Sequence, residues 1–181
     1  RQVMVAYTVA LVGFSQAESS TFESFLRLAA RRPPGYRVQD EVIDAQILVV
    51  NADNIYVVGV RRMFPIASYV CYALQHTQKR VHLISGLGGL YHDQVRSIRE
   101  NDLMIAISFQ PYGRETRYCA RVAAQNKAKL LVISDSKMSP LARNASTVLT
   151  VKEGTAFAFR SMSSTISLCQ ALFIALSYRL E

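Results

Sequence analysis

Short runs of β-branched and other apolar residues recur along the chain from Asp53 onward. They are IYVVGV (55–60), VHLI (81–84), LMIAIS (103–108), KLLVIS (129–134) and TVLTV (147–151). Runs of this length and composition, bounded by turn residues, predict β-strands. Because the apolar residues follow one another without alternation, the pattern is typical of strands that are buried on both faces of a sheet.

The segments between the first four runs show helical periodicity. In the first of them, five apolar residues fall on one helical face: Ile66, Tyr69, Val70, Ala73 and Leu74. Another helix is expected over 116–126, and a long apolar one over about 156–179, which we expect to pack on the sheet or on a second subunit. Strands that alternate with helices predict an α/β fold, a three-layer α/β/α sandwich around a five-stranded parallel sheet.

Residues 1–40 do not show the alternation of strand and helix patterns that the chain shows from Asp53 onward. Ser20 and Glu23 have the spacing of a capping box, which predicts that a helix begins there. The segment RRPPGY breaks that helix, and the next one is expected over 41–51. The chain therefore divides into an N-terminal helical segment with a linker, residues 1–40, and one domain over 41–181.

The composition suits a globular domain, with 50% hydrophobic residues, but the formal net charge is +8. A basic balance favours anionic partners, such as phosphorylated metabolites or nucleic acid. The arginines are scattered, with doublets only at 31–32 and 61–62, and no basic tail or basic–aromatic interleaving is present. Direct nucleic-acid binding by these residues is therefore not predicted.

The cysteine positions and the lengths of the apolar runs argue against disulfide-rich, metal-binding and membrane proteins. Cys71, Cys119 and Cys169 lie far apart in apolar segments without metal-site spacing, so we expect free buried thiols, no metal and a reducing, cytoplasmic compartment. No apolar run is long and unbroken enough to span a bilayer, so no membrane partner is expected. Neither a GxGxxG nor a Walker A pattern is present, which argues against a nucleotide and leaves no cofactor predicted.

Four polar loops follow the first four predicted strands: GVRRMFP, SGLGGLYHD, SFQPYGRET and SDSKMSPLA. In an open parallel sheet, ligands bind beyond the carboxyl ends of the strands, where these loops gather. Hydroxyls, glycines and helix N–H groups suit a phosphate, and Arg61, Arg62 and Arg114 add positive charge. Serine and glycine are also ordinary turn and cap residues, but four such loops at one edge predict an anionic small-molecule site.

No pair of residues stands out as an acid–base couple. His92, after the glycine-rich loop, and Glu153, just beyond the fifth strand, are the candidate bases near the ligand edge. A surface histidine near a helix start is the simpler interpretation of His92. No GxSxG elbow is present, so the sequence assigns no catalytic residue.

From about Asp53 to its end, the chain resembles a SIS (sugar isomerase) domain. The segments that carry the resemblance are ADNIYVVGV, ENDLMIAISF and LLVISDSKMSPLARNAS. RRMFPIASYVCYAL together with SFQPYGRET is similar to the RpiR/MurR branch of bacterial transcription regulators, which place a helix-turn-helix domain before a phosphosugar-sensing SIS domain. The resemblance implies the SIS fold, a homodimer or tetramer, a phosphosugar or related anionic ligand, and DNA bound by a helix-turn-helix domain outside this chain.

The resemblance also implies where the ligand binds. In SIS domains a loop of the form S-x-S-G-x-T holds the phosphate; Ser108 matches its first serine and Thr116 its threonine, with three extra residues between them. The family's first loop, G-x-G-x-S, is represented by Gly59–Met63, without the second glycine and the serine. We therefore expect arginines to replace hydroxyl contacts and the ligand to differ from the usual one. The predicted binding residues are Arg61, Arg62, Ser85, Ser108, Gln110, Tyr112, Gly113, Arg114 and Thr116.

Three functional hypotheses follow from the sequence. The first is a ligand-sensing domain of a DNA-binding regulator of carbohydrate metabolism, without catalysis. The second is an aldose–ketose isomerase that acts on a sugar phosphate, with His92 or Glu153 as its base. The third is an assembly module whose site is vestigial, which the missing glycine and serine of the first loop favour.

Overall fold

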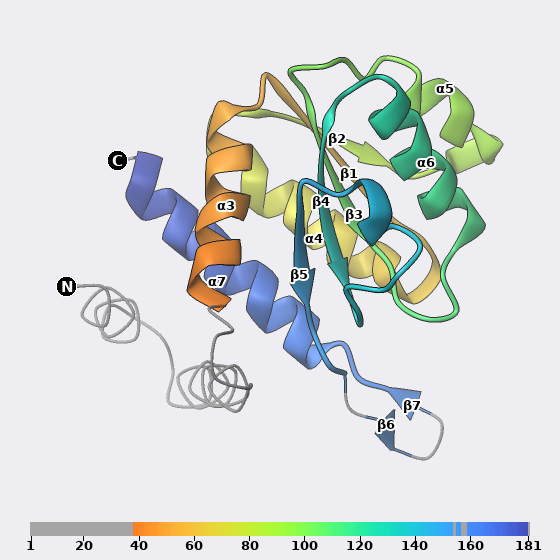
Figure 1. Ribbon diagram of the computed structural model, residues 1–181, viewed down its shortest axis with the longest axis vertical. Coiled ribbons are helices and arrows are strands. Elements are labelled where there is room, and N and C mark those ends of the chain that lie inside the picture. The colour runs from red at the N-terminus through yellow and green to blue at the C-terminus, as the bar shows by residue number, and fades with distance from the viewer. Residues whose placement is uncertain (1–37, 154, 157–158, 181) are drawn as a thin grey trace.

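A computed structural model describes residues 38–153, 155–156 and 159–180, and its centre is a five-stranded sheet in the order β2-β1-β3-β4-β5 (Figure 1). Every pairing in this sheet is parallel; Val57, for example, pairs with Leu83 on one side and Ile105 on the other. The strands are β1 (Asn54–Gly59), β2 (Arg80–Ile84), β3 (Leu103–Ile107), β4 (Lys129–Ser134) and β5 (Thr147–Thr150). All five predicted strands are confirmed.

Helices cover both faces of the sheet, which confirms the predicted three-layer α/β/α sandwich. On one face lie α3 (Val38–Asn51), α4 (Phe64–Gln75) and α7 (Ser163–Leu180), and on the other lie α5 (Tyr91–Val95) and α6 (Arg114–Gln125) (Figure 1). Three 3₁₀ turns, η1 (Arg61–Met63), η2 (Leu87–Gly89) and η3 (Ala142–Asn144), lie in the loops after β1, β2 and β4.

The inner strand β1 contributes side chains to both cores. Ile55 and Val57 point into the core under α3, α4 and α7, whereas Tyr56 and Val58 point into the core under α5 and α6. Each fully buried aliphatic side chain of this kind contributes about 1.5–3 kcal/mol. The expectation that every strand is buried on both faces is wrong for β2, whose residues Arg80 and His82 are exposed. This strand lies at the sheet edge, where it has a single neighbour.

The predicted start of the last helix near residue 156 is wrong. Helix α7 begins at Ser163, and it is preceded by a short antiparallel pair, β6 (Thr155–Ala156) and β7 (Phe159–Arg160), that projects from the domain (Figure 1). The Ser161 hydroxyl accepts a hydrogen bond from the N–H of Ser163 at 3.1 Å, so one N–H group of the first helical turn is satisfied there.

The other helix boundaries are close to those predicted. Helix α3 begins three residues before position 41 and α6 two residues before position 116, and α7 packs on the sheet as expected. The helix predicted to begin near Ser20 and the RRPPGY linker lie outside the described residues, so the domain division at residue 40 stays a prediction.

The three cysteines are buried free thiols, as predicted. Burial raises the pKa of Cys119 and of Cys169 to about 12, so these thiols do not ionise in the folded protein near neutral pH. Among the described helices, none combines the length and hydrophobicity that crossing a bilayer requires.

Candidate functional site

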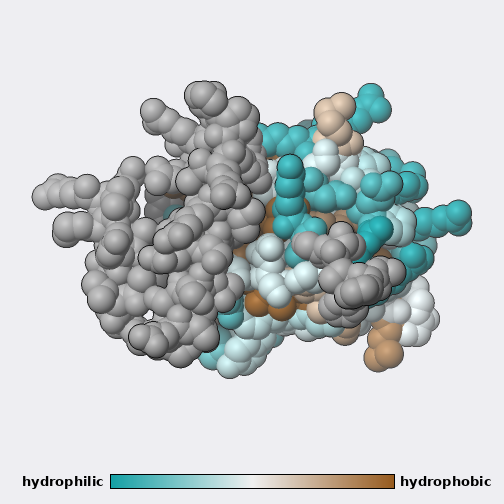
Figure 2. Space-filling model, turned by 90° about the horizontal axis from the view of Figure 1, so that it is seen from below, coloured by the Kyte–Doolittle hydropathy of each residue, from teal (hydrophilic) through white to brown (hydrophobic). Residues whose placement is uncertain are grey.

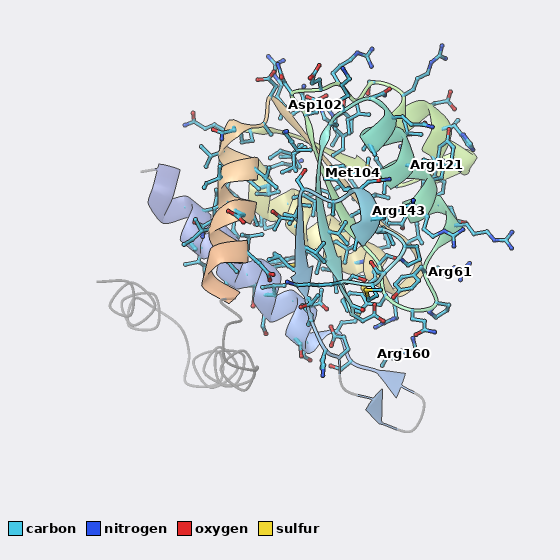
Figure 3. The ribbon with its side chains drawn as sticks, in the orientation of Figure 1. Arg61, Asp102, Met104, Arg121, Arg143 and Arg160 are labelled. Atoms are coloured by element: carbon cyan, nitrogen blue, oxygen red, sulfur yellow. The ribbon has the colours of Figure 1, made fainter. Side chains whose placement is uncertain are left out.

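The loops that follow the strands gather at one edge of the sheet. Figure 3 shows Arg61, just after β1, and Arg160, at the end of β7, toward this lower edge, while Asp102, just before β3, lies at the opposite end. Figure 2 looks toward the molecule from the lower side, and hydrophilic side chains cover most of the coloured surface there, with smaller hydrophobic areas between them. The predicted ligand edge is therefore a polar surface.

The loop between β3 and α6 is tied to β4 by Asp135. Its carboxylate accepts the Tyr112 hydroxyl at 2.9 Å and the backbone N–H of Gln110 at 3.3 Å. Burial, followed by the hydrogen-bonded Asp135 carboxylate, raises the pKa of Tyr112, so the phenol remains a donor. Tyr112 and Gln110 are thus held by the protein itself. Asp135 was not predicted, although its place directly after a buried strand was a usable signal.

Ser108 and Thr116 stand at the two ends of this loop. Ser108 is 3% exposed, and its carbonyl oxygen accepts the Ser134 hydroxyl at 2.8 Å. Thr116 is fully buried in the first turn of α6, and its hydroxyl has no hydrogen-bond partner among the described residues. No side chain caps the start of α6 either, so the N–H groups of its first turn have no side-chain acceptor.

Gly113 brings the loops after β1 and β3 together. A Cβ atom at this position would lie 2.3 Å from Cγ2 of Val60, a distance that no packing allows. The same atom would lie 3.5 Å from the Thr116 hydroxyl oxygen, so the glycine also leaves space beside that hydroxyl. Gly59 is similarly constrained, because a Cβ there would lie 2.8 Å from the carbonyl oxygen of Met63.

The predicted arginines occupy different places. Arg62 turns toward the start of α7, where it donates to the carbonyl oxygen of Ser161 at 3.4 Å, and its guanidinium lies 5.4 Å from the Phe109 ring centroid. Arg61 and Arg114 are exposed at the rim. Arg160, which sequence reasoning missed, donates to the carbonyl oxygen of Gln110. Its contact spans fifty positions, so no local pattern signalled it.

Ser85 lies on the loop after the edge strand β2. Its hydroxyl accepts from the N–H of Leu87 and from the side-chain amide of Gln94, both at 3.3 Å. Gln94 in turn accepts from the N–H of Gly86 at 2.8 Å. The described contacts of Ser85 therefore stabilise its own loop. Of the predicted residues, Ser108, Gln110, Tyr112, Gly113 and Thr116 belong to the segment 108–116, which Arg62 contacts through Phe109. Ser85 lies on a separate loop, and Arg61 and Arg114 are exposed.

Two glutamates at this edge keep a buried carboxylate oxygen without a partner among the described residues. Glu153 accepts from the N–H of Thr165 at 3.0 Å and from its hydroxyl with one oxygen, and its second oxygen is unpaired. Glu115 has the same kind of buried oxygen. Burial and the nearby Glu115 carboxylate raise the pKa of Tyr91. Buried polar atoms are usually hydrogen-bonded, so such exceptions mark places where a ligand donor fits.

His92, the other candidate base, lies on α5 with its ring 4.1 Å from the Tyr118 ring of α6. The exposed His92 ring therefore contacts the neighbouring helix at the surface, as the simpler interpretation predicted. No group of three or more histidine, cysteine, aspartate or glutamate side chains within the described ranges is placed to hold a metal ion.

Comparison with known proteins adds a family and a fold. A family model described as SIS domain matches residues 48–175. No curated protein matches the chain in sequence. The sugar isomerase domain of an RpiR transcription factor from Sphaerobacter thermophilus superposes with a TM-score of 0.76 and 22% identity, over 90% of this chain and 87% of that one.

Two further solved structures are similar in fold. The NanR protein of Vibrio vulnificus, complexed with ManNAc-6P, has a TM-score of 0.71 and 17% identity over 90% of this chain and 62% of that one. A hypothetical protein from Methanococcus jannaschii, with an inferred molecular function of 3-hexulose-6-phosphate isomerase, has a TM-score of 0.67 and 12% identity over 90% and 86%. Regulators and sugar-phosphate isomerases thus share this fold.

Proposed function

Because this chain belongs to the SIS domain family, we propose that it is the phosphosugar-sensing domain of a DNA-binding transcription regulator of carbohydrate metabolism. Similarity to the RpiR factor and to NanR supports a regulator, and the ManNAc-6P bound to NanR supports a phosphorylated sugar as the ligand class. The proposal places the DNA-binding helix-turn-helix outside these residues, in a cytoplasmic homodimer or tetramer.

The observation that carries the proposal is the buried, unpartnered hydroxyl of Thr116 at the start of α6. Leaving such a group unpaired costs about 1–3 kcal/mol in a folded protein. A phosphate oxygen that accepts from this hydroxyl and from the uncapped N–H groups of α6 removes that cost. Arg62, whose guanidinium lies 5.4 Å from the Phe109 ring centroid, and Ser108, at the other end of the loop, are the further donors that we assign to this site.

The test is thermal-shift binding of a panel of hexose, pentose and N-acetylhexosamine phosphates to the full 181-residue chain. We expect at least one sugar phosphate to raise the melting temperature. Thr116→Val is expected to weaken that binding about 10- to 100-fold, the loss typical of a hydrogen bond to a charged group. Ser163→Ala, on the exposed start of α7, is the matched control and leaves binding unchanged.

Two outcomes contradict the proposal. If no member of the panel stabilises the protein, sensing of these sugar phosphates is refuted, and strong self-association without any response favours the assembly module. If Thr116→Val and Ser163→Ala weaken binding equally, the ligand is not held at the start of α6.

A second candidate function is an aldose–ketose isomerase, which the buried free oxygen of Glu153 favours. Isomerisation needs one base that moves a proton between adjacent carbons of the sugar, and a carboxylate beside the ligand edge suits that role. Direct assays for interconversion of hexose and pentose phosphates decide between the two. Turnover that disappears in Glu153→Gln establishes the enzyme; binding without turnover supports the sensor.

A further inference from the structure

We propose that the outer surface of α5, α6 and η3 binds the phosphate backbone of double-stranded DNA. We call this surface the basic face. Its exposed positive residues are Arg96, Arg99, Arg114, Arg117, Arg121, Lys127 and Arg143. The inference concerns DNA contact by this domain itself, goes beyond the sugar-phosphate site, and does not depend on it.

Helix periodicity aligns the arginines of α6. Arg114, Arg117 and Arg121 are separated by three and four positions, so they share one side of the helix, and all three are exposed. The opposite side of α6 is buried through Thr116, Cys119, Ala120 and Ala123. The helix therefore presents a row of guanidinium groups to solvent.

The segment after α5 lies beside this row. The rings of His92 and Tyr118 are 4.1 Å apart, and the Asn126 side-chain amide donates to the carbonyl oxygen of Ile98 at 3.2 Å. These contacts place Arg96 and Arg99 next to the C-terminal half of α6. Because these arginines are scattered along the sequence, the sequence alone did not show that they lie together.

Arg143 joins the basic face from a distant part of the sequence. Leu141, just before η3, belongs to the same buried cluster as the inner side of α6. Figure 3 shows Arg121 and Arg143 on the same side of the sheet.

Little negative charge offsets these groups. Asp93 and Glu100 are the exposed carboxylates of the described segments that form this layer. No arginine of the basic face has a carboxylate within ion-pair distance among the described residues; the described pair, Lys137 with Glu41, involves α3. On the other side of the sheet, α4 has no charged residue at all.

The chemistry of the basic face fits a phosphate backbone better than a protein partner or a membrane. No exposed large hydrophobic side chain of the described residues lies within α5, α6 or η3 themselves; Leu90 precedes α5, Met138 lies in the loop before η3, and the others are Ile47, Phe64, Tyr72 and Leu87. Protein interfaces have an apolar or aromatic core, and membrane-surface helices insert apolar side chains. A row of arginines without apolar anchors instead matches the guanidinium–phosphate contacts that position proteins on DNA.

The test measures binding of the 181-residue chain to a short fluorescein-labelled DNA duplex by anisotropy, over about 50–200 mM salt. Arg117→Gln/Arg121→Gln removes two charges from the basic face. Arg80→Gln/Lys152→Gln removes two exposed charges elsewhere, so both variants have the same formal charge, the original +8 less two. Arg114 is left unchanged because it also borders the predicted ligand loop.

We expect the wild-type chain to bind with a steep negative slope of log affinity against log salt. Each lost phosphate contact lowers that slope by about 0.9, so Arg117→Gln/Arg121→Gln should lower it by about 1.8 and weaken binding more than about tenfold at 0.1 M salt. The control pair should keep the wild-type slope. The single variant Arg117→Gln, with about half the change in slope, replaces the double variant if the latter fails to fold by circular dichroism.

Three results overturn the inference: no DNA binding at low salt, equal losses in both double variants, or tighter binding to a polyglutamate peptide than to DNA. Sugar-phosphate stabilisation should remain intact in Arg117→Gln/Arg121→Gln. The proposal of DNA binding can therefore fail while the proposal of sugar-phosphate sensing stands, and the reverse.

Discussion

At the amino ends of the strands, the buried carboxylate of Asp102 uses both of its oxygens. One accepts from the N–H and the side-chain amide of Asn54, at 3.2 and 2.8 Å, and the other accepts from the N–H of Arg99 at 2.8 Å. At the carboxyl ends, four buried polar atoms have no described partner. They belong to Glu115, Thr116, Ser139 and Glu153.

We call a polar side chain closed when it has hydrogen-bond partners in the protein, and open when a buried polar atom has none among the described residues. Lys79 gives a second example of the closed kind, because its ammonium group donates to the carbonyl oxygens of Val50 and Ala52 before β1 begins. Such closed groups stabilise the fold, since each charged group has protein partners. The open groups at the other edge leave hydrogen-bonding capacity for a molecule that binds there. Polar residues of the same types therefore have protein partners at the amino edge and keep unpaired atoms at the carboxyl edge, where we propose that a ligand binds.

The largest expected effect is at the closed edge. Asp102→Ala leaves the donors of Asn54 and Arg99 without an acceptor, so we expect the free energy of unfolding to fall by about 3 kcal/mol. Urea denaturation measures it, with the exposed Asp93→Ala as the control that changes stability by less than about 0.5 kcal/mol. Similar losses in both variants would show that the Asp102 contacts contribute little.

Asp135 sharpens the comparison, because it is a closed group at the open edge. Asp135→Ala removes the acceptor of Tyr112 and Gln110, and we expect a loss of about 2 kcal/mol in unfolding free energy. Hydrogen exchange of the amides at 109–113 should accelerate at the same time. Unchanged exchange would mean that the loop keeps its shape without this carboxylate.

Tyr112→Phe removes only one of these bonds, so we expect a smaller loss of about 1 kcal/mol at neutral pH. The pKa of Tyr112 is raised in the fold, so its contribution is fully present below the unfolded value of about 10 and is lost as the pH rises through the higher folded value. Stability curves of the two proteins should therefore begin to converge near about pH 10 and meet only above the folded pKa of Tyr112. A gap that persists there would exclude the phenol proton as its cause.

The smallest effects are expected at the open groups. Thr116→Val and Ser139→Ala each remove a buried hydroxyl without a described partner, so the unfolding free energy should stay within about 0.5 kcal/mol of the wild type or rise. Ligand binding, in contrast, should weaken in Thr116→Val. A destabilisation above about 1 kcal/mol in the absence of ligand would show that the hydroxyl has a partner inside the protein, which breaks the contrast between the edges.

The sequence predicted the sheet, its two helical layers and the loops of the candidate site because these depend on local patterns. Runs such as LMIAIS can be buried only as central strands, and the polar loops follow them directly. Arg160 was missed because its partner lies 50 positions away; the partner of Asp135 lies 25 positions away, and only its place directly after a strand was a signal. The basic face was missed for the same reason: helix packing, and not sequence proximity, brings Arg96 and Arg143 to α6.

The close approach of Gly113 to Val60 also constrains how this site can change over generations. A side chain at position 113 has no room while Val60 keeps its Cγ2 atom 2.3 Å from the place of the new Cβ. Residue 60 therefore has to become smaller before residue 113 can become larger, and the reverse order passes through a clash. A larger side chain at position 113 is therefore reached only by a restricted order of mutations.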